Sequence, residues 1–376
     1  MLTEGVSPNT MGHLIRRRFA NPPSPEGKAR IQEETPLTYQ EVLSTAREAM
    51  SKNCKACPVC NGRACTNHIP GPGSKGVGDT AIRNFDKWQE IRVNMDTIAE
   101  GGDPDTSLEL FGQKFRFPFF AGPVGAVTMH YSDKYNDQSY NNILVKACAE
   151  NGIAAFTGDG LDANVMKVAC EAIAASKGMG VPTVKPWNQD TVAEKMEMVK
   201  ASGSFAVAMD IDAAGLPFLK GMNPPAGSKT VEQLSEIAKM AGKPFIIKGV
   251  MTVKGALKAK EAGAAAIVVS NHGGRVLDQC PATAEVLPAI VEALKGSGVK
   301  ILVDGGIRSG VDVFKALALG ADAVIIARPF VSAVYGGAEE GVKLYIDKIG
   351  GELADTMSMC GAKTLADITR DMVFVK

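Results

Sequence analysis

Short apolar runs alternate regularly with amphipathic segments from Phe117 to the end of the chain, and this pattern constrains the fold most. Each run is continuous and rich in β-branched residues, as in parallel strands buried on both faces. The eight runs of strand length are Phe117–Gly122, Ile153–Thr157, Val181–Lys185, Phe205–Asp210, Pro244–Lys248, Ala265–Ser270, Ile301–Asp304 and Ala323–Ala327.

The segments between these runs repeat their apolar residues with a helical period. Examples are Thr230–Ala241, Val253–Ala262, Thr283–Lys295 and Gly310–Leu319. Eight strands with intervening helices over about 250 residues match the size and order of a (β/α)8 barrel. An open doubly wound sheet usually has fewer strands and an early glycine-rich turn. The sequence therefore predicts an α/β protein with a TIM barrel over residues 111–376.

Residues 1–110 do not follow this pattern. Leu37–Ser51 is predicted to be a helix, with Thr38 as its N-cap and Glu41 three residues later. A cysteine-rich segment follows, and then the proline- and glycine-rich stretch Ile69–Gly78. Since there is too little apolar periodicity for a separate core, we expect an N-terminal extension that packs against the barrel, at its mouth.

Polar residues follow the predicted strands at the end where barrels of this kind carry their function. The fifth strand ends in Lys248, and the sixth runs into a turn that holds His272, Gly273, Gly274 and Arg275. The histidine can titrate near neutrality and the arginine is a fixed, forked cation. This pairing suits a small-molecule substrate with an acidic proton at one end and an anion at the other.

The last two strands end in residues that suit a phosphate. Asp304–Gly310 is a glycine-rich turn that leads into a helix and contains Arg308. Backbone N–H groups and the positive end of a helix attract anions. A second arginine, Arg328, precedes Pro329, which is well placed to begin a helix. The sequence therefore predicts a phosphorylated cofactor at this rim.

A cluster of cysteines lies ahead of the barrel, at Cys54, Cys57, Cys60 and Cys65, with His68 close by. Thiolates at this spacing could converge on Zn²⁺ or on an iron–sulfur cluster. Thiol redox chemistry, a disulfide and simple packing are the other interpretations. An iron–sulfur cluster near a redox cofactor could carry electrons away one at a time, which favours a dehydrogenase over an O2-consuming oxidase.

Charge and hydropathy exclude several partners. Lys+Arg and Asp+Glu both number 41, so there is no global charge to attract nucleic acid or an anionic membrane. No apolar run approaches ~18 residues, so we expect no membrane-spanning helix. The first residues lack the layout of a signal peptide, which predicts a cytoplasmic protein. In that compartment the eight cysteines are expected to be thiols or metal ligands.

Ser270–Asp278, followed by Pro281-Ala-Thr, resembles the active-site signature of the FMN-dependent α-hydroxy acid oxidase/dehydrogenase family, which includes glycolate and lactate oxidases. The resemblance spans roughly residues 76 to 376. Further matches are Lys248-Gly249-Val250, Asp304–Arg308, Asp312–Gly320 and Ala327–Pro329.

The resemblance implies a role for each catalytic position. His272 would be the general base that takes the substrate proton as two electrons pass to flavin N5. Arg275 would hold the substrate carboxylate, and Lys248 would face flavin N1/O2. Asp212, expected on the fourth strand, would orient the histidine. The family also implies a homo-oligomer, commonly a tetramer, with O2 or an electron-acceptor protein as oxidant.

The resemblance also implies a set of FMN-binding residues. The positions that touch the flavin would be Pro123, Val124, Gly125 and Gly158, and those at the ribityl phosphate would be Asp304, Gly306, Arg308 and Arg328. Lys185 (in place of a glutamine), Ser270, Gly305 and Ala327 complete the implied set.

This chain departs from the family around the substrate. Pro70–Lys75 and Val184–Trp187 lack the family's two tyrosines, and Ala213–Leu219 lacks its second substrate arginine. Asp210 stands where the family has a threonine near the flavin. Three hypotheses follow: oxidation of a 2-hydroxy acid or a related compound, other flavin chemistry such as isomerisation or cysteine-linked reduction, and flavin binding without turnover.

Overall fold

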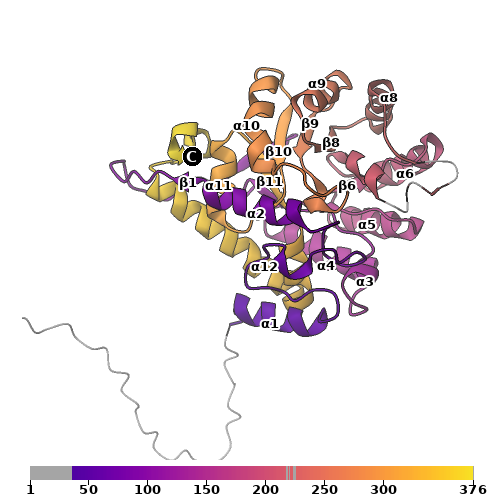
Figure 1. Cartoon of the computed structure of the whole chain (residues 1–376), viewed down its shortest axis with the longest axis horizontal. Helices are drawn as coiled ribbons and strands as arrows, with labels where there is room; N and C mark the ends of the chain where they lie inside the picture. Colours follow the sequence, from indigo (N-terminus) through magenta and orange to yellow (C-terminus); the bar gives the residue numbers. More distant parts are fainter. Residues whose placement is uncertain (1–35, 217–218, 220, 223–225, 376) are drawn as a thin grey trace, which may run out of the picture. The chain divides into compact units, whose positions relative to one another are not determined.

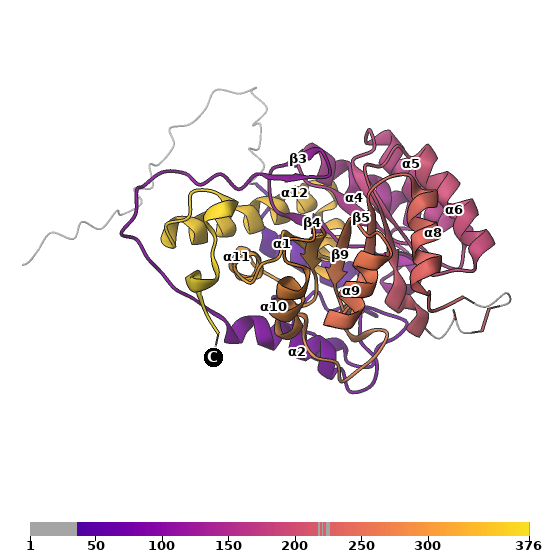
Figure 2. The same cartoon turned by 90° about the horizontal axis from the view of Figure 1, so that it is seen from above.

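Eight parallel strands close into a barrel in the computed structural model, which describes residues 36–216, 219, 221–222 and 226–375 (Figures 1 and 2). The strands follow one another around the barrel in chain order, and the last pairs with the first, with Val324 opposite Phe119. They are β4 (Phe119–Ala121), β5 (Ala155–Thr157), β6 (Gly180–Val184), β7 (Val207–Asp210), β8 (Phe245–Val250), β9 (Ala266–Val269), β10 (Lys300–Val303) and β11 (Ala323–Ile326).

Helices surround the barrel, as Figure 1 shows. They are α4 (Asp137–Glu150), α5 (Ala163–Ala175), α6 (Gln189–Ala201), α8 (Val231–Ala241), α9 (Val253–Glu261), α10 (Thr283–Leu294), α11 (Gly310–Ala318) and α12 (Arg328–Met359). The predicted barrel is confirmed, and each predicted strand overlaps one of the eight. The main difference is in β8, which continues past Lys248 to Val250 through a shift of register.

Apolar side chains form two layers because strand residues alternate between the inside and the outside of the barrel. The inner layer holds Phe120, Phe156, Ile246 and Leu302, while the larger outer layer lies between strands and helices. A hairpin of β2 (Leu108–Leu110) and β3 (Gln113–Phe115) adds apolar side chains to the inner layer. The ring of Phe115 meets that of Phe120 edge-on, with centroids 4.9 Å apart.

The described residues from Leu37 onward form one compact unit, in which the segment before the hairpin packs with the barrel. Helix α1 (Tyr39–Ala49) has the predicted capping box of Thr38 and Glu41 and packs against α12 (Figure 1). The predicted boundary at residue 110 stays a prediction, and residues 1–35 lie outside the described part. The remaining elements are η1 (Arg63–Cys65), α2 (Asp79–Glu90), β1 (Arg92–Val93), α3 (Val127–His130), η2 (Ile211–Gly215), η3 (His272–Gly274), η4 (Leu365–Asp367), η5 (Arg370–Met372) and β12 (Val373–Phe374).

Within the described ranges, no helix combines the length and the apolar character that crossing a bilayer requires.

Candidate functional site

A cavity of about 790 Å³ lies at the carboxyl ends of the barrel strands. Its volume is within the range of small-molecule and cofactor sites. Most of the residues predicted from the sequence line it: Pro123, Val124, Gly125, Gly158, Lys185, Lys248, His272, Arg275, Asp304, Gly305, Gly306, Arg308, Ala327 and Arg328. Of the other two predicted residues, Asp212 contacts His272, and Ser270 is buried, with its hydroxyl accepting a hydrogen bond from the His272 backbone N–H.

A buried group of charges surrounds the candidate base. His272 Nδ1 lies 3.0 Å from Asp212 Oδ1 and 3.4 Å from Asp210 Oδ2. Lys248 Nζ lies 2.9 Å from Asp210 Oδ1 and 3.6 Å from Asp304 Oδ2. Because an ionised carboxylate can only accept, Nδ1 of the histidine carries the proton and donates it toward Asp212. The other ring nitrogen, Nε2, is then the one that can take a proton.

The barrel itself brings these charges together. Asp210 ends β7 and is the direct register partner of Lys248 on β8. Asp212 lies two residues further on, in η2, and not on the fourth strand as predicted, because the chain turns into a 3-10 helix after Asp210. Gly249 makes room for this turn: it has φ +104°, and a Cβ there would lie 2.7 Å from Cβ of Asp212.

Burial and neighbouring charges shift the pKa values of this group in opposite directions. Burial would raise the pKa of Asp210, but His272, Lys248 and Lys185 outweigh it and lower that pKa. Burial and the charge of Asp210 raise the pKa of Asp212. Burial would lower the pKa of Lys248, but Asp210 and Asp304 raise it. Asp210 is therefore the permanent anion of the site.

The turn that carries His272 is braced by a pair of amides. Asn84 of α2 and Asn271 exchange two side-chain hydrogen bonds, of 2.7 and 3.0 Å, and both residues are buried. His272 has φ +55°, a conformation that costs a non-glycine residue energy and persists when the surroundings impose it. The bracing fixes the imidazole at the cavity wall.

Arg275 is held by the N-terminal segment. Its Nη1 donates to the carbonyls of Gly71 and Gly73, at 2.6 and 2.7 Å. The N–H of Gly71 in turn donates to Nδ1 of His130, at 3.0 Å, and His130 also lines the cavity. Burial, Arg275 and Lys185 lower the pKa of His130 to about 4, so its ring is neutral at pH 7 with its proton on Nε2.

Sequence reasoning did not identify His130 as a site residue. Its only sequence signal is a histidine soon after the first barrel strand. A second omission is Asp159, a buried carboxylate that accepts from Lys195 Nζ at 2.7 Å and from the backbone N–H of Lys185 at 3.0 Å. This contact fixes the chain where Lys185 enters the cavity. The sequence does not predict that Lys195 contacts Asp159, because a lysine on a helix usually faces solvent.

The two arginines predicted for the phosphate both line the cavity. Arg308 is anchored by donating from Nε to the carbonyl of Cys60, at 2.7 Å, and from Nη1 to that of Ile307, at 2.6 Å. Arg328 is buried. Close packing also requires glycine at two of the predicted positions: a Cβ at Gly306 would lie 2.2 Å from the Asn84 carbonyl oxygen, and one at Gly158 would lie 2.4 Å from the Val124 backbone.

The four clustered cysteines line a second, smaller cavity of about 130 Å³, and Arg328 lines both cavities. Burial alone would raise the pKa of the Cys60 thiol, but the positive charges of Arg308 and Arg328 outweigh burial and lower this pKa. Burial raises the pKa of Cys54 to about 12. The structure therefore brings the predicted cysteines together beside the predicted phosphate site.

The larger cavity fits a flavin nucleotide. Thr183 Oγ1 and Asp304 Oδ1 are buried without a hydrogen-bond partner among the described residues, and both residues line the cavity. Buried polar atoms of this kind call for a polar ligand. The arginines and the apolar side chains in the lining, such as Val124, suit a phosphate and an aromatic ring system.

Comparisons with known proteins agree with this geometry. In sequence, the chain is 50% identical over 145 residues to a peroxisomal (S)-2-hydroxyacid oxidase of Arabidopsis thaliana, a match that spans 39% of each protein. It is 25% identical over 384 residues to an FMN-dependent alpha-hydroxy acid dehydrogenase of Penicillium citrinum, covering 90% of this chain and 92% of that protein.

In structure, the chain is similar to a mandelate oxidase mutant with a monooxide FMN adduct, at 26% identity and a TM-score of 0.69, covering 82% of this chain and 94% of the other. The family model for FMN-dependent dehydrogenases matches residues 72–218 and 220–375. With this match on the barrel and cavity described above, the chain belongs to the FMN-dependent dehydrogenase family.

Proposed function

We propose that the protein is an FMN-dependent oxidoreductase that oxidises a 2-hydroxy acid, or a related compound with an activated C–H bond, to the 2-oxo product. One observation carries this proposal: an imidazole oriented by the carboxylate of Asp212 lies in a cavity with Lys248 and Arg275. Bound FMN supplies a two-electron acceptor.

The residues that would hold FMN come from several strand ends. Arg308 and Arg328 would bind its phosphate, since guanidinium groups match phosphate geometry. Thr183 and Asp304 would contact it through the oxygens that have no partner among the described residues. Lys248, with Asp210 beside it, would lie at the ring system, where its charge would compensate negative charge that the ring gains on reduction.

Proton removal is the task of His272. Its Nδ1–H donates to Asp212, which leaves the lone pair of Nε2 for the substrate proton. After transfer the imidazolium lies beside Asp210 and Asp212, and the two carboxylates stabilise its positive charge.

Arg275 and His130 would bind the substrate carboxylate. Carbonyls hold Nη1 of the arginine, and the other guanidinium nitrogens can face the cavity. The Nε2–H of His130 is a neutral donor that could replace a hydroxyl of the family's missing tyrosines. A donor pair of this kind favours a carboxylate next to the carbon that is oxidised.

The test is anaerobic addition of a panel of short and aryl-substituted 2-hydroxy acids to the FMN-loaded protein, followed by flavin absorbance. We expect at least one acid to bleach the flavin. In His272→Ala the FMN should stay bound and be bleached by dithionite, while bleaching by the acid slows by roughly 10²–10⁴-fold.

The other outcomes decide against this function. Bleaching with a chemical reductant but with no acid would favour other flavin chemistry, such as isomerisation or reduction. A flavin that no reductant bleaches would favour a binding protein without turnover. Full activity in His272→Ala would remove the proposed base. Assembly as a homo-oligomer remains a prediction, which size-exclusion chromatography with light scattering would test.

A further inference from the structure

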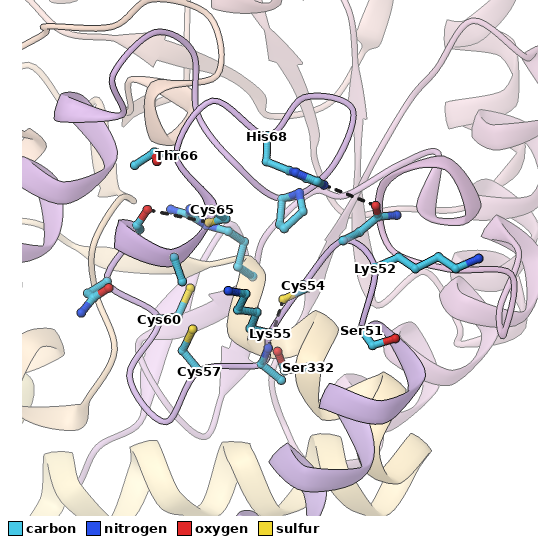
Figure 3. A pocket seen from close by; sticks show the side chains of 17 residues that line it. Ser51, Lys52, Cys54, Lys55, Cys57, Cys60, Cys65, Thr66, His68 and Ser332 are labelled. Atoms are coloured by element: carbon cyan, nitrogen blue, oxygen red, sulfur yellow. Dashed lines mark hydrogen bonds between the residues drawn. The ribbon is translucent and has the colours of Figure 1, made fainter.

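The cysteines of the N-terminal segment surround a cavity of their own. Cys54, Cys57, Cys60 and Cys65 are partly buried and form no disulfide, and they line the 130 Å³ cavity. Figure 3 shows the sulfur atoms of Cys57 and Cys60 turned toward each other and that of Cys54 turned toward the same space. We propose that these four thiolates bind a 4Fe–4S cluster that accepts electrons from the reduced flavin.

The spacing of the sulfur atoms favours an iron–sulfur cluster over zinc. A tetrahedral zinc with Zn–S bonds of about 2.3 Å holds its sulfurs only about 3.8 Å apart. In the described part of the chain, no three of these cysteine sulfurs lie within 4.8 Å of one another. A 4Fe–4S cluster places a cage of iron and sulfide between its four thiolates and so needs them further apart. The cavity between the side chains provides space for that cage.

The cysteine loop is held in shape by residues outside it. Arg47 of α1 donates from Nε to the carbonyl of Lys55 and from Nη2 to that of Ala56, at 3.0 and 3.3 Å. Ala56 has φ +37°, and its N–H donates to Cys54 Sγ at 3.5 Å. Hydrogen bonds to the sulfurs are among the features that tune the potential of an iron–sulfur cluster. The loop is therefore shaped for ligands before a cluster is added.

The positive charge around this cavity suits an anionic cluster. Four thiolates give an iron–sulfur cluster a net negative charge. Arg328 lines the cysteine cavity, and Arg308 donates to the carbonyl of Cys60. The same arginines line the flavin cavity. The two cavities therefore share a wall, and a cluster in one would lie next to the cofactor in the other.

The electron-transfer part of this inference rests on the proposed function. Oxidation of a 2-hydroxy acid to a 2-oxo acid releases two electrons and two protons. A 4Fe–4S cluster takes one electron at a time, and a one-electron carrier protein would collect it. One turnover would therefore reduce two carrier molecules, while the two protons leave to solvent through His272 and the flavin.

The first experiment is metal analysis of the full chain, purified without oxygen and reconstituted with ferrous iron and sulfide. We expect about four iron and four acid-labile sulfide per chain, with an EPR signal after dithionite reduction. Cys57→Ser should lose iron but keep its FMN absorbance. The matched control is Cys280→Ser, which changes a partly exposed thiol outside this loop and should keep its iron. Three results would contradict the proposed cluster: zinc in place of iron, a disulfide between these cysteines, or full iron content in Cys57→Ser.

The second experiment separates the cluster from the proposed substrate. The flavin is reduced by light with EDTA as the electron donor, and the EPR signal of the cluster is followed. Appearance of the signal supports electron transfer whatever the substrate is. A cluster that dithionite reduces but the photoreduced flavin does not would overturn that transfer. If photoreduction works and no 2-hydroxy acid bleaches the flavin, the substrate proposal fails and the transfer stands.

Discussion

Asp210 is the residue that most distinguishes this site. It pairs with Lys248 at 2.9 Å, lies 3.4 Å from His272, and is buried. The family resemblance places a threonine at this position, which carries no charge. A permanent anion here opposes the arrival of electrons at a neighbouring ring system, since reduction adds negative charge.

We therefore expect Asp210→Asn to raise the reduction potential of the bound flavin. The shift should be roughly 30 mV or more, equivalent to about 1.4 kcal/mol for a two-electron couple. Spectroelectrochemical titration of the FMN-loaded variant measures it. Asp190→Asn is the matched control, because Asp190 is an exposed aspartate at the start of α6. An unchanged potential in Asp210→Asn would show that Lys248 already cancels the charge.

His130 predicts a specific pH dependence of stability. Burial, Arg275 and Lys185 lower its pKa to about 4, below the ordinary value of 6.5. Between pH 6.5 and pH 4, His130 is therefore protonated in the unfolded chain but neutral in the folded protein. This contribution to stability is present above pH 6.5 and is lost as the pH falls toward 4.

The loss between pH 7 and pH 5 should be about 1–2 kcal/mol. In His130→Gln, which keeps an acceptor for the Gly71 N–H but cannot titrate, the same change of pH should cost less by that amount. Denaturant unfolding of both proteins at the two pH values measures the difference. If both proteins lose the same free energy of unfolding between pH 7 and pH 5, the pKa of His130 is not lowered by folding.

The sequence predicted the residues that stand directly at strand ends, such as His272, Arg275 and Lys248. These positions follow from strand boundaries alone. The partnership of Asp210 with Lys248 depends on the register between two strands, which a single sequence does not determine. His130 is the last residue of α3, the short helix after β4, and its hydrogen bond from Gly71 joins segments far apart in the chain. Side-chain placement of this kind could not be predicted.

At the scale of elements, the prediction was more complete. The eight strands and the capped helix α1 were predicted because period and capping are local signals. The continuation of β8 was not predicted. Its register shift between Lys248 and Val250 depends on Gly249, whose positive φ is needed because η2 lies against it.

Gly249→Ala should therefore damage both stability and catalysis. The strained φ and the contact with Asp212 should cost about 1–3 kcal/mol and move the carboxylate that orients His272. Gly242→Ala is a matched control, because Gly242 also has positive φ (+61°) but has open space around its Cβ position. We expect both variants to lose stability and only Gly249→Ala to slow flavin bleaching. Equal bleaching rates would exclude this role of the contact.

At the scale of the whole molecule, one carboxylate joins the N-terminal segment to the active-site turn. Asp278 Oδ2 accepts from the N–H groups of Val77 and Gly78, at 2.8 and 3.2 Å, and its Oδ1 accepts from that of Thr80, at 3.1 Å. The N-cap Gly78 has no capping side chain. Asp278 therefore caps α2 from about two hundred residues away in the sequence.

Asp278→Ala should lower the free energy of unfolding by about 1–3 kcal/mol, since it removes a charged acceptor from three donors. Asp278→Asn keeps one acceptor oxygen and should lose less. Hydrogen exchange at residues 77–80 should speed up in the order wild type, Asn, Ala. Unchanged exchange at these amides would contradict the role of Asp278 as a cap.

The pairing of β11 with β4 and of α12 with α1 has a consequence for biosynthesis. Each pair joins an early segment to one of the latest, so a chain still emerging from the ribosome has neither contact. Since Arg328 begins α12, the proposed phosphate ligand Arg328 is also absent until then. We therefore expect the nascent protein to capture its flavin only after translation has passed residue 328.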